Sequence, residues 1–517
     1  MKIALQILVM FAAFFAAFAA RNCNLENRAP HADEGEQAAT FMKLFESGEY
    51  SYNPNGPHGP TLYYYADAAA KISGGSDGAK ITIAQLRQYL LPVLFLIFAI
   101  LIFGARDMGR MGALWACAAA AMCPLVGIYS AYFVQEIILA MSVLGLALAT
   151  WGFFCRPSFK SAVFIGLFAG LAQATKETAL LFYAGIVVST IAAMFIDKGI
   201  FQNLLSELNK KAFAAAFLSL AIFALIFCAF YSSFGKNFGG LWDAFASYAH
   251  FSEKAGSEDF SNGFLYYFKL LTLQTSSGVK FGCLPIAIFA LCGLCWAIWL
   301  RMRNDAENLR ESAFVIFLSA NALFTTLFMS FVTYKTPWLL LTPAVFMCAV
   351  AGYGIAKMLS VKNIFAWLAM LAAVCALGWW QYRLNYFAME RFHSDPRNPF
   401  LFTHTVPNYG KMIDRIKSGA KVSEYENDIP IAFITEHSPW PAPWDLRTYR
   451  NAGFWSGGAT PQSLDVFEII VCDSTTEPAV LSMIRQEDYV QEFFGLRDNY
   501  LLTFFMKKGL FNKAIEE

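Results

Sequence analysis

The chain has 517 residues, of which 57% are hydrophobic and only 15% are charged, and this composition excludes an ordinary water-soluble protein. Its 39 Lys and Arg residues balance 38 Asp and Glu residues, so it has no surplus of positive charge for a phosphate backbone, which argues against nucleic acid as a partner. Aromatic residues make up 16% of the chain, as expected for helices that face lipid. We therefore expect a polytopic membrane protein.

Apolar runs long enough to cross a bilayer recur along the chain, since a hydrocarbon core about 30 Å thick requires about 20 apolar residues per helix. They predict about eleven spans, at residues 3–20, 89–104, 111–128, 132–154, 161–175, 177–196, 212–231, 281–300, 312–333, 338–356 and 364–380. The first run also fits a cleavable signal peptide. We interpret it as a retained span, and either outcome leaves the next loop on the same side.

Basic residues occupy every second connection between these runs, which predicts the orientation of the chain. By the positive-inside rule, these connections face the cytoplasm. Two long loops, at 21–88 and 232–280, are then expected on the outer face, together with everything after residue 380. The pattern predicts a multi-pass protein of the cytoplasmic (inner) membrane.

The composition changes near residue 380, which divides the chain into a transmembrane module, 1–380, and a second domain, 381–517. In the second part the charge density rises and the apolar runs shorten to strand length. Strand patterns at 429–434, 466–472 and 500–506 alternate with helical patterns around 407–418 and 477–486. We expect a polytopic all-α membrane protein with a small extracytoplasmic C-terminal α/β domain.

The first outer loop carries two groups of candidate residues. Asp33 and Glu34 are adjacent carboxylates near the membrane surface, where such groups can act as a general base or hold a cation. The alternative is a solvated acidic turn. His58 lies in a segment dense in Pro and Gly, 52–60, which predicts a fixed loop beside an aromatic interfacial helix. By itself His58 is also consistent with an ordinary hydrogen-bonding loop residue.

Charged residues also stand at the outer ends of several spans: Glu136, Lys176, Glu177 and Lys335. Ionisable groups at membrane depth are costly, so each is a candidate functional residue. The alternative for Lys176 and Glu177 is an exposed turn with a snorkelling lysine.

No cofactor is certain from the sequence. The eleven cysteines lie mostly in apolar runs and are interpreted as small hydrophobic residues rather than a zinc site, while a disulfide between Cys23 and Cys472 stays open. Asp33 and Glu136 could bind Mg²⁺ or Mn²⁺ through oxygen, so metal use is unknown. A nucleotide-binding loop is absent, which argues against direct use of ATP or a nucleotide-sugar.

Four sequence blocks carry a resemblance to a known family. They are His58-Gly59-Pro60-x-x-Tyr63-Tyr64, Ala174-Thr175-Lys176-Glu177-Thr178, Tyr334-Lys335-Thr336-Pro337-Trp338 and Trp440-Pro441-x-Pro443-Trp444-x-x-Arg447. With Asp33-Glu34 and Glu136, they resemble the GT-C glycosyltransferases. More narrowly, the chain is similar to the family 39 (dolichyl-phosphate-mannose protein mannosyltransferase) superfamily, in a prokaryotic branch named for association with flippase activity.

The resemblance implies transfer of a mannose-like hexose from a polyprenyl-phosphate donor to an outer-face acceptor, with inversion at the anomeric carbon. It implies that Asp33 is the general base and that Glu34 shapes the loop or assists. Glu136 and His58 would position the acceptor or a cation, and Lys176 and Lys335 would contact the donor phosphate. The expected substrate groove contains Tyr64, Glu177, Trp338, Trp440 and Arg447.

The chain departs from the family pattern at one position. Where Tyr-Ser-Arg-Phe is expected, it has Tyr129-Ser130-Ala131-Tyr132, so one phosphate contact is missing or supplied elsewhere. Residues 440–447 also admit a simpler interpretation as a Pro-Trp packing motif.

Three functional alternatives stay open. The expected partners are a lipid-linked sugar donor and membrane lipid, with an unidentified protein, lipid or glycan acceptor. The alternative to an enzyme is a non-catalytic flippase or transport-associated subunit of a glycoconjugate pathway, although transporters usually carry midplane charges and repeated halves. A catalytically silent scaffold is a third possibility.

Overall fold

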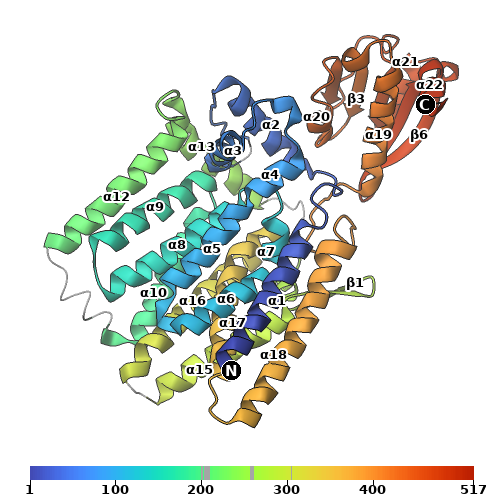
Figure 1. The fold of residues 1–517 in the computed structure, drawn as a ribbon. Helices are drawn as coiled ribbons and strands as arrows, with labels where there is room; N and C mark the ends of the chain where they lie inside the picture. The colour runs from blue at the N-terminus through green and yellow to red at the C-terminus, as the bar shows by residue number, and fades with distance from the viewer. Residues whose placement is uncertain (57, 200–201, 203–209, 257–260, 304–305, 517) are drawn as a thin grey trace.

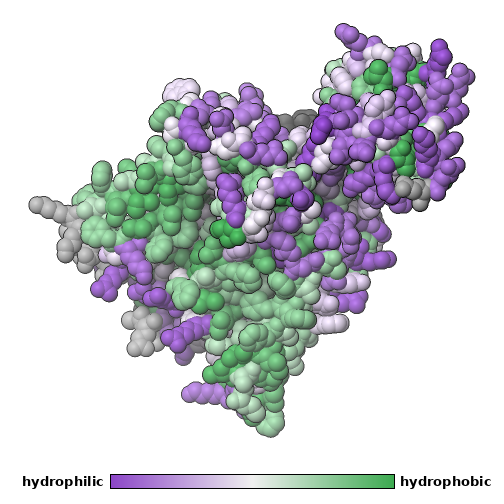
Figure 2. Space-filling model, turned by 45° about the horizontal axis from the view of Figure 1, so that its top comes forward, coloured by the Kyte–Doolittle hydropathy of each residue, from purple (hydrophilic) through white to green (hydrophobic). Residues whose placement is uncertain are grey.

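The computed structural model describes residues 1–56, 58–199, 202, 210–256, 261–303 and 306–516. Figure 1 shows a bundle of long helices with a smaller mixed domain, formed by the C-terminal part of the chain, beside one end of it. We call this end of the bundle the domain side. On the face shown in Figure 2, the bundle is largely hydrophobic and the C-terminal domain is largely hydrophilic.

The described part of the chain contains nine helices that are long and apolar enough to cross a membrane. They are α1 (Lys2–Asn22), α4 with α5 (Ile83–Gly104), α8 (Glu136–Cys155), α10 (Ala179–Ile196), α12 (Lys210–Tyr231), α15 (Leu284–Met302), α16 (Ala306–Phe331), η3 with α17 (Pro337–Met358), and α18 with η4 (Ile364–Arg391). This bears out a polytopic helical protein. The expected number of about eleven spans needs correction.

Two of the expected runs form shorter helices. The run at 161–175 becomes α9 (Phe159–Thr175), and the run at 111–128 is divided into α6 (Gly109–Ala121) and α7 (Pro124–Tyr129). Pro124 causes the division, because a residue before proline avoids the helical conformation, and Cys123 has φ −83° and ψ 122°. The result is one bent element instead of a straight span.

The core of the bundle is built around α17 and α8. Of the most apolar 18 residues of each helix, 83% in α17 and 72% in α8 are buried, against 6% in α12. Small residues allow α17 to approach its neighbours closely: a Cβ atom on Gly352 would lie 2.1 Å from the backbone nitrogen of Ala116 in α6. Close helix contact therefore fixes the centre of the bundle.

Short elements cover the domain side of the bundle. The first loop forms α2 (Ala32–Ser47), α3 (Thr61–Ile72) and η1 (Gly78–Lys80), followed by α4 (Ile83–Tyr89), which leads into α5 (Leu91–Gly104). The second loop forms α13 (Gly239–Gly256), α14 (Tyr266–Leu271) and the hairpin of β1 (Leu273–Ser276) and β2 (Val279–Gly282). In Figure 1, α2 and α3 lie above the ends of the long helices.

The C-terminal domain is a five-stranded mixed sheet in the order β4-β3-β5-β7-β6. The strands are β3 (Ile431–Thr435), β4 (Ala452–Ser456), β5 (Ile469–Asp473), β6 (Tyr489–Arg497) and β7 (Tyr500–Lys507). Strand β3 pairs in parallel with β4 and β5, and β7 pairs antiparallel with β5 and β6. The helices are α19 (Pro407–Val422), α20 (Ala442–Asp445), α21 (Glu477–Met483) and α22 (Lys508–Glu516). The expected α/β character is confirmed.

Three strands of this sheet, β3, β5 and β7, were predicted from sequence, and two edge strands were missed. The predicted strands are central and largely buried, so they form continuous apolar runs. The edge strand β4 is short and only half-buried, and β6 alternates buried with solvated positions and contains charged residues. Edge strands of this kind have weak sequence signals.

We predict that Gly352→Ala lowers the unfolding free energy by about 1–3 kcal/mol, because the added Cβ atom must push α17 away from α6. The matched control is Gly378→Ala in α18, where no atom lies within 4 Å of an added Cβ. Thermal melting of both variants in detergent measures the difference. Equal melting temperatures for the two variants would contradict the close packing of α17 and α6.

Candidate active site

Helix α2 begins with a capping box that orients its first turn. His31 is the N-cap: its Nδ1 accepts a hydrogen bond from the Asp33 N–H (3.1 Å), and its own N–H donates to Glu34 Oε2 (3.1 Å). His31 Nε2 lies 2.7 Å from the Phe402 carbonyl oxygen, and this contact assigns the ring proton to Nε2. Asp33 Oδ1 lies 3.9 Å from the unprotonated Nδ1, so the two do not form an ion pair. The Asp33 side chain is 47% exposed.

Glu34, in contrast, is completely buried and fully hydrogen-bonded. Arg87 donates to both carboxylate oxygens, at 2.8 and 2.6 Å, and the Phe133 N–H donates at 2.9 Å. Burial alone would raise the pKa of Glu34, but the charge and hydrogen bonds of Arg87, together with Arg28, hold it well below its usual range. Glu34 is therefore ionised and has no free oxygen with which to take a proton near neutral pH.

Two further arginines, Arg28 and Arg21, lie next to Arg87. Arg28 lies 3.9 Å from Glu34, stacks over the Tyr132 ring at 4.1 Å and donates to the Ala131 carbonyl oxygen. Burial and the charge of Arg87 lower the pKa of Arg28 to about 10, which still leaves it charged at neutral pH. Arg21, at the end of α1, donates to the carbonyl oxygen of Ser130 at 2.7 Å and to its hydroxyl oxygen at 3.3 Å.

Arg21, Arg28 and Arg87 form what we call the arginine cluster. These three residues are only 4%, 7% and 0% exposed, respectively. Within the described parts of the chain, the ion pairs of the cluster are made with Glu34 alone. Three positive groups against one negative group leave a net charge of +2 in a buried place. Such a charge is unfavourable without an anionic partner.

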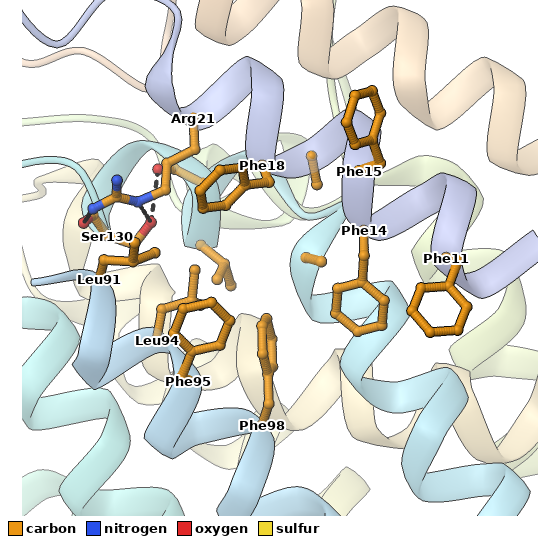
Figure 3. Close-up of a pocket in the computed structure, with 14 residues that line it drawn as sticks. Phe11, Phe14, Phe15, Phe18, Arg21, Leu91, Leu94, Phe95, Phe98 and Ser130 are labelled. Atoms are coloured by element: carbon orange, nitrogen blue, oxygen red, sulfur yellow. Dashed lines mark hydrogen bonds between the residues drawn. The ribbon is translucent and has the colours of Figure 1, made fainter. Parts of the chain in front are cut away.

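An apolar groove ends at this cluster. It has a volume of about 360 Å³, and rings such as Phe14 of α1 and Phe95 and Phe98 of α5 line its walls (Figure 3). Arg21 and Ser130 are the polar residues of its lining. Asp33 does not line this groove. A hydrocarbon chain could therefore lie in it with a polar end near Arg21 and Ser130.

Glu136 and Lys176 form a buried ion pair beneath α2. The side-chain amides of Gln37 and Gln135 exchange two hydrogen bonds, at 3.0 and 2.9 Å, and so connect α2 to the start of α8. Lys176 and Glu177 are both buried. The alternative of an exposed turn with a snorkelling lysine is therefore wrong.

Glu177 connects the end of α9 to the first loop. It accepts a hydrogen bond from Tyr52 Oη at 3.0 Å and lies 2.8 Å from His58 Nδ1. Gly59, which follows His58 in the sequence, donates from its N–H to the Thr175 carbonyl oxygen. A Cβ atom at Gly59 would lie 2.2 Å from the carbonyl oxygen of Ala174. The loop around His58 is thus held directly against the segment that contains Lys176.

Aromatic and histidine rings surround the N-terminus of α2. The ring of Trp338 lies 6.1 Å from His31 and 5.0 Å from Phe402, measured between centroids. His404 stacks on His31 at 6.1 Å and lies 2.8 Å from Tyr132 Oη through its Nδ1. Burial lowers the pKa of His404 well below its usual range, so this ring is neutral.

Lys335, close to Trp338 in sequence, donates through Nζ to the Val332 carbonyl oxygen. This contact is with a neutral backbone group, in contrast to the ion pair of Lys176.

Tyr64 and Trp440, which were also predicted to line the substrate groove, contact other residues of the chain. Tyr64 packs against Tyr50, Phe230 and Phe234. In the C-terminal domain, the Trp440 carbonyl accepts a hydrogen bond from Arg497 at 2.9 Å.

Residues 440–447 attach the C-terminal domain to the cover of the bundle. Pro441 and Trp440 lie where a Cβ on Gly35 of α2 would point. Arg447 donates to the Ile81 carbonyl at 2.7 Å and stacks on Trp444.

Sequence reasoning missed the arginine cluster. Arg21 and Arg87 stand at the ends of apolar runs, where a basic residue usually marks only the membrane border, and Arg28 lies in a polar loop. Their sequence separation hides their convergence. The available signal was the position of Arg87 next to a predicted span, since charged groups there are candidates by default.

The structure also bears on metals and disulfides. Among the residues it describes, no group of three or more His, Cys, Asp or Glu side chains is arranged to hold a metal ion. Glu136 is paired with Lys176 through one of its carboxylate oxygens. Cys23 is exposed and Cys472 is buried, and both are free thiols, which rules out the disulfide that the sequence left open.

The comparisons with known proteins identify the fold. No protein-family model and no curated protein sequence matches the chain. Among solved structures, ArnT from Cupriavidus metallidurans bound to undecaprenyl phosphate has a TM-score of 0.61 and 13% identity, with 97% of each chain covered. The apo state of ArnT has a TM-score of 0.60 and 14% identity, again with 97% of each chain covered.

A second solved protein is also similar. The archaeal oligosaccharyltransferase AglB from Archaeoglobus fulgidus, in complex with an inhibitory peptide and a dolichol-phosphate, has a TM-score of 0.55 and 11% identity, and the match covers 99% of this chain and 77% of AglB. The fold is GT-C-like. The expected GT-C architecture is thereby confirmed, whereas the narrower likeness to family 39 rests on the sequence blocks alone.

We predict that Glu34→Leu lowers the unfolding free energy by about 3–5 kcal/mol, because it leaves the arginine cluster without its carboxylate. Arg87→Leu should lower the unfolding free energy by less, because Arg28 still faces Glu34. The double variant should be more stable than the sum of the two losses implies. Thermal melting measures all three, with Glu424→Leu, from an exposed pair with Lys513, as the control. A Glu34→Leu variant as stable as this control would contradict the claim that the Glu34 carboxylate stabilises the arginine cluster.

Proposed function

We propose that the chain is an integral membrane glycosyltransferase that moves a sugar from a polyprenyl-phosphate donor to an acceptor at the domain side of the bundle. The GT-C-like fold supports the proposal, because ArnT was solved with undecaprenyl phosphate and AglB with a dolichol-phosphate. The positive-inside pattern supports an extracytoplasmic domain side, in the cytoplasmic membrane. A mannose-like sugar rests on the sequence resemblance, and the acceptor is a protein, a lipid or a glycan.

The arginine cluster is the observation that carries this proposal. Its buried net charge of +2 lies at the end of an apolar groove, and a lipid phosphate would supply both the missing negative charge and a tail for the groove. The family pattern expects an arginine where this chain has Ala131. Arg28 brings its guanidinium to the carbonyl oxygen of that same residue, so the missing phosphate contact has a candidate replacement.

Asp33 is the proposed general base. Its carboxylate is about half exposed, whereas that of Glu34 is fully engaged, so only Asp33 of this pair is available to an acceptor. The acceptor hydroxyl oxygen forms a bond to the anomeric carbon while the bond from that carbon to the phosphate oxygen breaks on the opposite face. Asp33 takes the hydroxyl proton, and polyprenyl phosphate leaves as an anion. A single displacement of this kind inverts the anomeric carbon.

The other residues have proposed supporting roles. The pair of Glu136 and Lys176 supports α2 from below and helps position the acceptor. Lys335, beside Trp338, is a second candidate contact for the donor phosphate. His58 and Glu177 hold the first loop in place.

The remaining predicted residues belong to the walls of the site. Trp338 borders the sugar next to α2, and Tyr64 packs within the cover of the bundle. Trp440 and Arg447 hold the C-terminal domain against that cover.

We predict that Asp33→Asn lowers the rate of sugar transfer at least about a hundredfold, because the amide does not accept the acceptor proton. The control is Asp77→Asn, since Asp77 lies in the same loop with a side chain 48% exposed. Transfer is measured with purified protein, a polyprenyl-phosphate sugar and the membrane fraction as the acceptor source. Melting curves establish that both variants fold.

Two other results would reject parts of this account. Full transfer by Asp33→Asn would remove the base assignment. No transfer by the native chain, while a lipid-linked sugar moves between leaflets, would favour the transport-associated alternative.

We also predict that Arg21→Gln weakens binding of polyprenyl phosphate about tenfold to a hundredfold, because a hydrogen bond to a charged group is lost. The control is Arg110→Gln, because Arg110 is exposed and lies after η2 (Arg106–Met108). Binding is measured by native mass spectrometry of the purified chain. Equal affinity in both variants would exclude Arg21 as a phosphate contact.

A further inference from the structure

A second cavity lies at the end of the bundle away from the C-terminal domain. It has a volume of about 580 Å³ and lies between α5, α8, α9 and η2. The groove that ends at Arg21 contacts α5 between Leu91 and Phe98, whereas this cavity contacts α5 between Ala99 and Gly104, farther along the helix, and the two share no lining residue. The second cavity is therefore a site of its own.

Positive side chains surround this cavity. Arg106 follows α5, Lys160 stands in the first turn of α9, and Arg310 comes from α16. Asp107 accepts hydrogen bonds from Arg310 Nε at 3.0 Å and from Trp151 Nε1 at 2.6 Å. Three cations and one carboxylate give the cavity a net charge of +2, and Arg106 and Lys160 are exposed at its rim.

The rest of the lining is apolar and suits a hydrocarbon chain. It includes Phe103 of α5, Leu148 of α8, and Phe164 and Phe168 of α9. Gly152 of α8 also lines the cavity, and an added Cβ there would have no atom within 4 Å. The floor is thus open beside a glycine in the interior of a helix, while the charges stand at the border.

We propose that this cavity binds an anionic diacyl phospholipid of the surrounding bilayer. The phosphodiester lies between Arg106 and Lys160, and one acyl chain passes over Gly152. The charge complementarity and the apolar floor carry the assignment, since basic pockets between helices at a membrane border bind acidic lipid headgroups. A bilayer phospholipid is the chosen occupant because it is the abundant lipid at this border. The proposal does not depend on glycosyl transfer.

Native mass spectrometry of the full chain with phosphatidylglycerol or phosphatidylcholine tests this assignment. We expect phosphatidylglycerol to bind at least tenfold more tightly. Arg106→Gln with Lys160→Gln should weaken its binding about twenty-fivefold, at about fivefold per cation. The control is Lys362→Gln, an exposed lysine in the α17–α18 connection and outside the cavity lining.

A second variant tests the apolar floor. Gly152→Leu fills the open space and should weaken phosphatidylglycerol binding as well, with the cations unchanged. Equal binding of both phospholipids, or no effect of the charge variants relative to Lys362→Gln, would overturn the proposal. Tighter binding of polyprenyl phosphate than of phosphatidylglycerol, lost in the same charge variants, would also overturn it in favour of the other lipid.

Discussion

The carboxylate of Glu34 is the constraint on which the domain side of this structure depends. Hydrogen bonds reach it from the cap of α2, from Arg87 of α4 and from the segment between α7 and α8. An ionised group buried this deeply is stable only when its lone pairs are occupied, so the three elements are held in one arrangement. Asp33 is the neighbouring residue in the same capped turn, and its side chain is 47% exposed.

The single negative charge of Glu34 does not balance the three positive charges of the arginine cluster. The arginine cluster keeps a net positive charge in a place shielded from water, next to a groove lined by phenylalanine rings. A lipid that carries a phosphate is complementary to both features. The local electrostatics thus support the lipid-phosphate donor that we propose, in a chain whose fold is GT-C-like.

Much of the architecture could be predicted because its signals are local. The long apolar runs form helices, and two short apolar runs form the buried strands β3 and β5. The number of spans was less predictable, since one proline bends the run that becomes α6 and α7. The site depends on distant contacts. The resemblance gives the adjacent residues Asp33 and Glu34 different roles, but only their contacts in the fold show that Asp33 is half exposed and Glu34 is buried. Burial of Lys176 and the arginine cluster likewise arise from tertiary packing.

The most direct measurement is a cryo-EM structure of the full chain in lipid nanodiscs with a bound polyprenyl-phosphate sugar. The account predicts that the phosphate lies within hydrogen-bond distance of Arg21 or Arg28, that the lipid tail follows the groove along α1, and that the sugar lies toward Asp33. A phosphate bound away from the arginine cluster, with the groove occupied by no part of the donor, would contradict it.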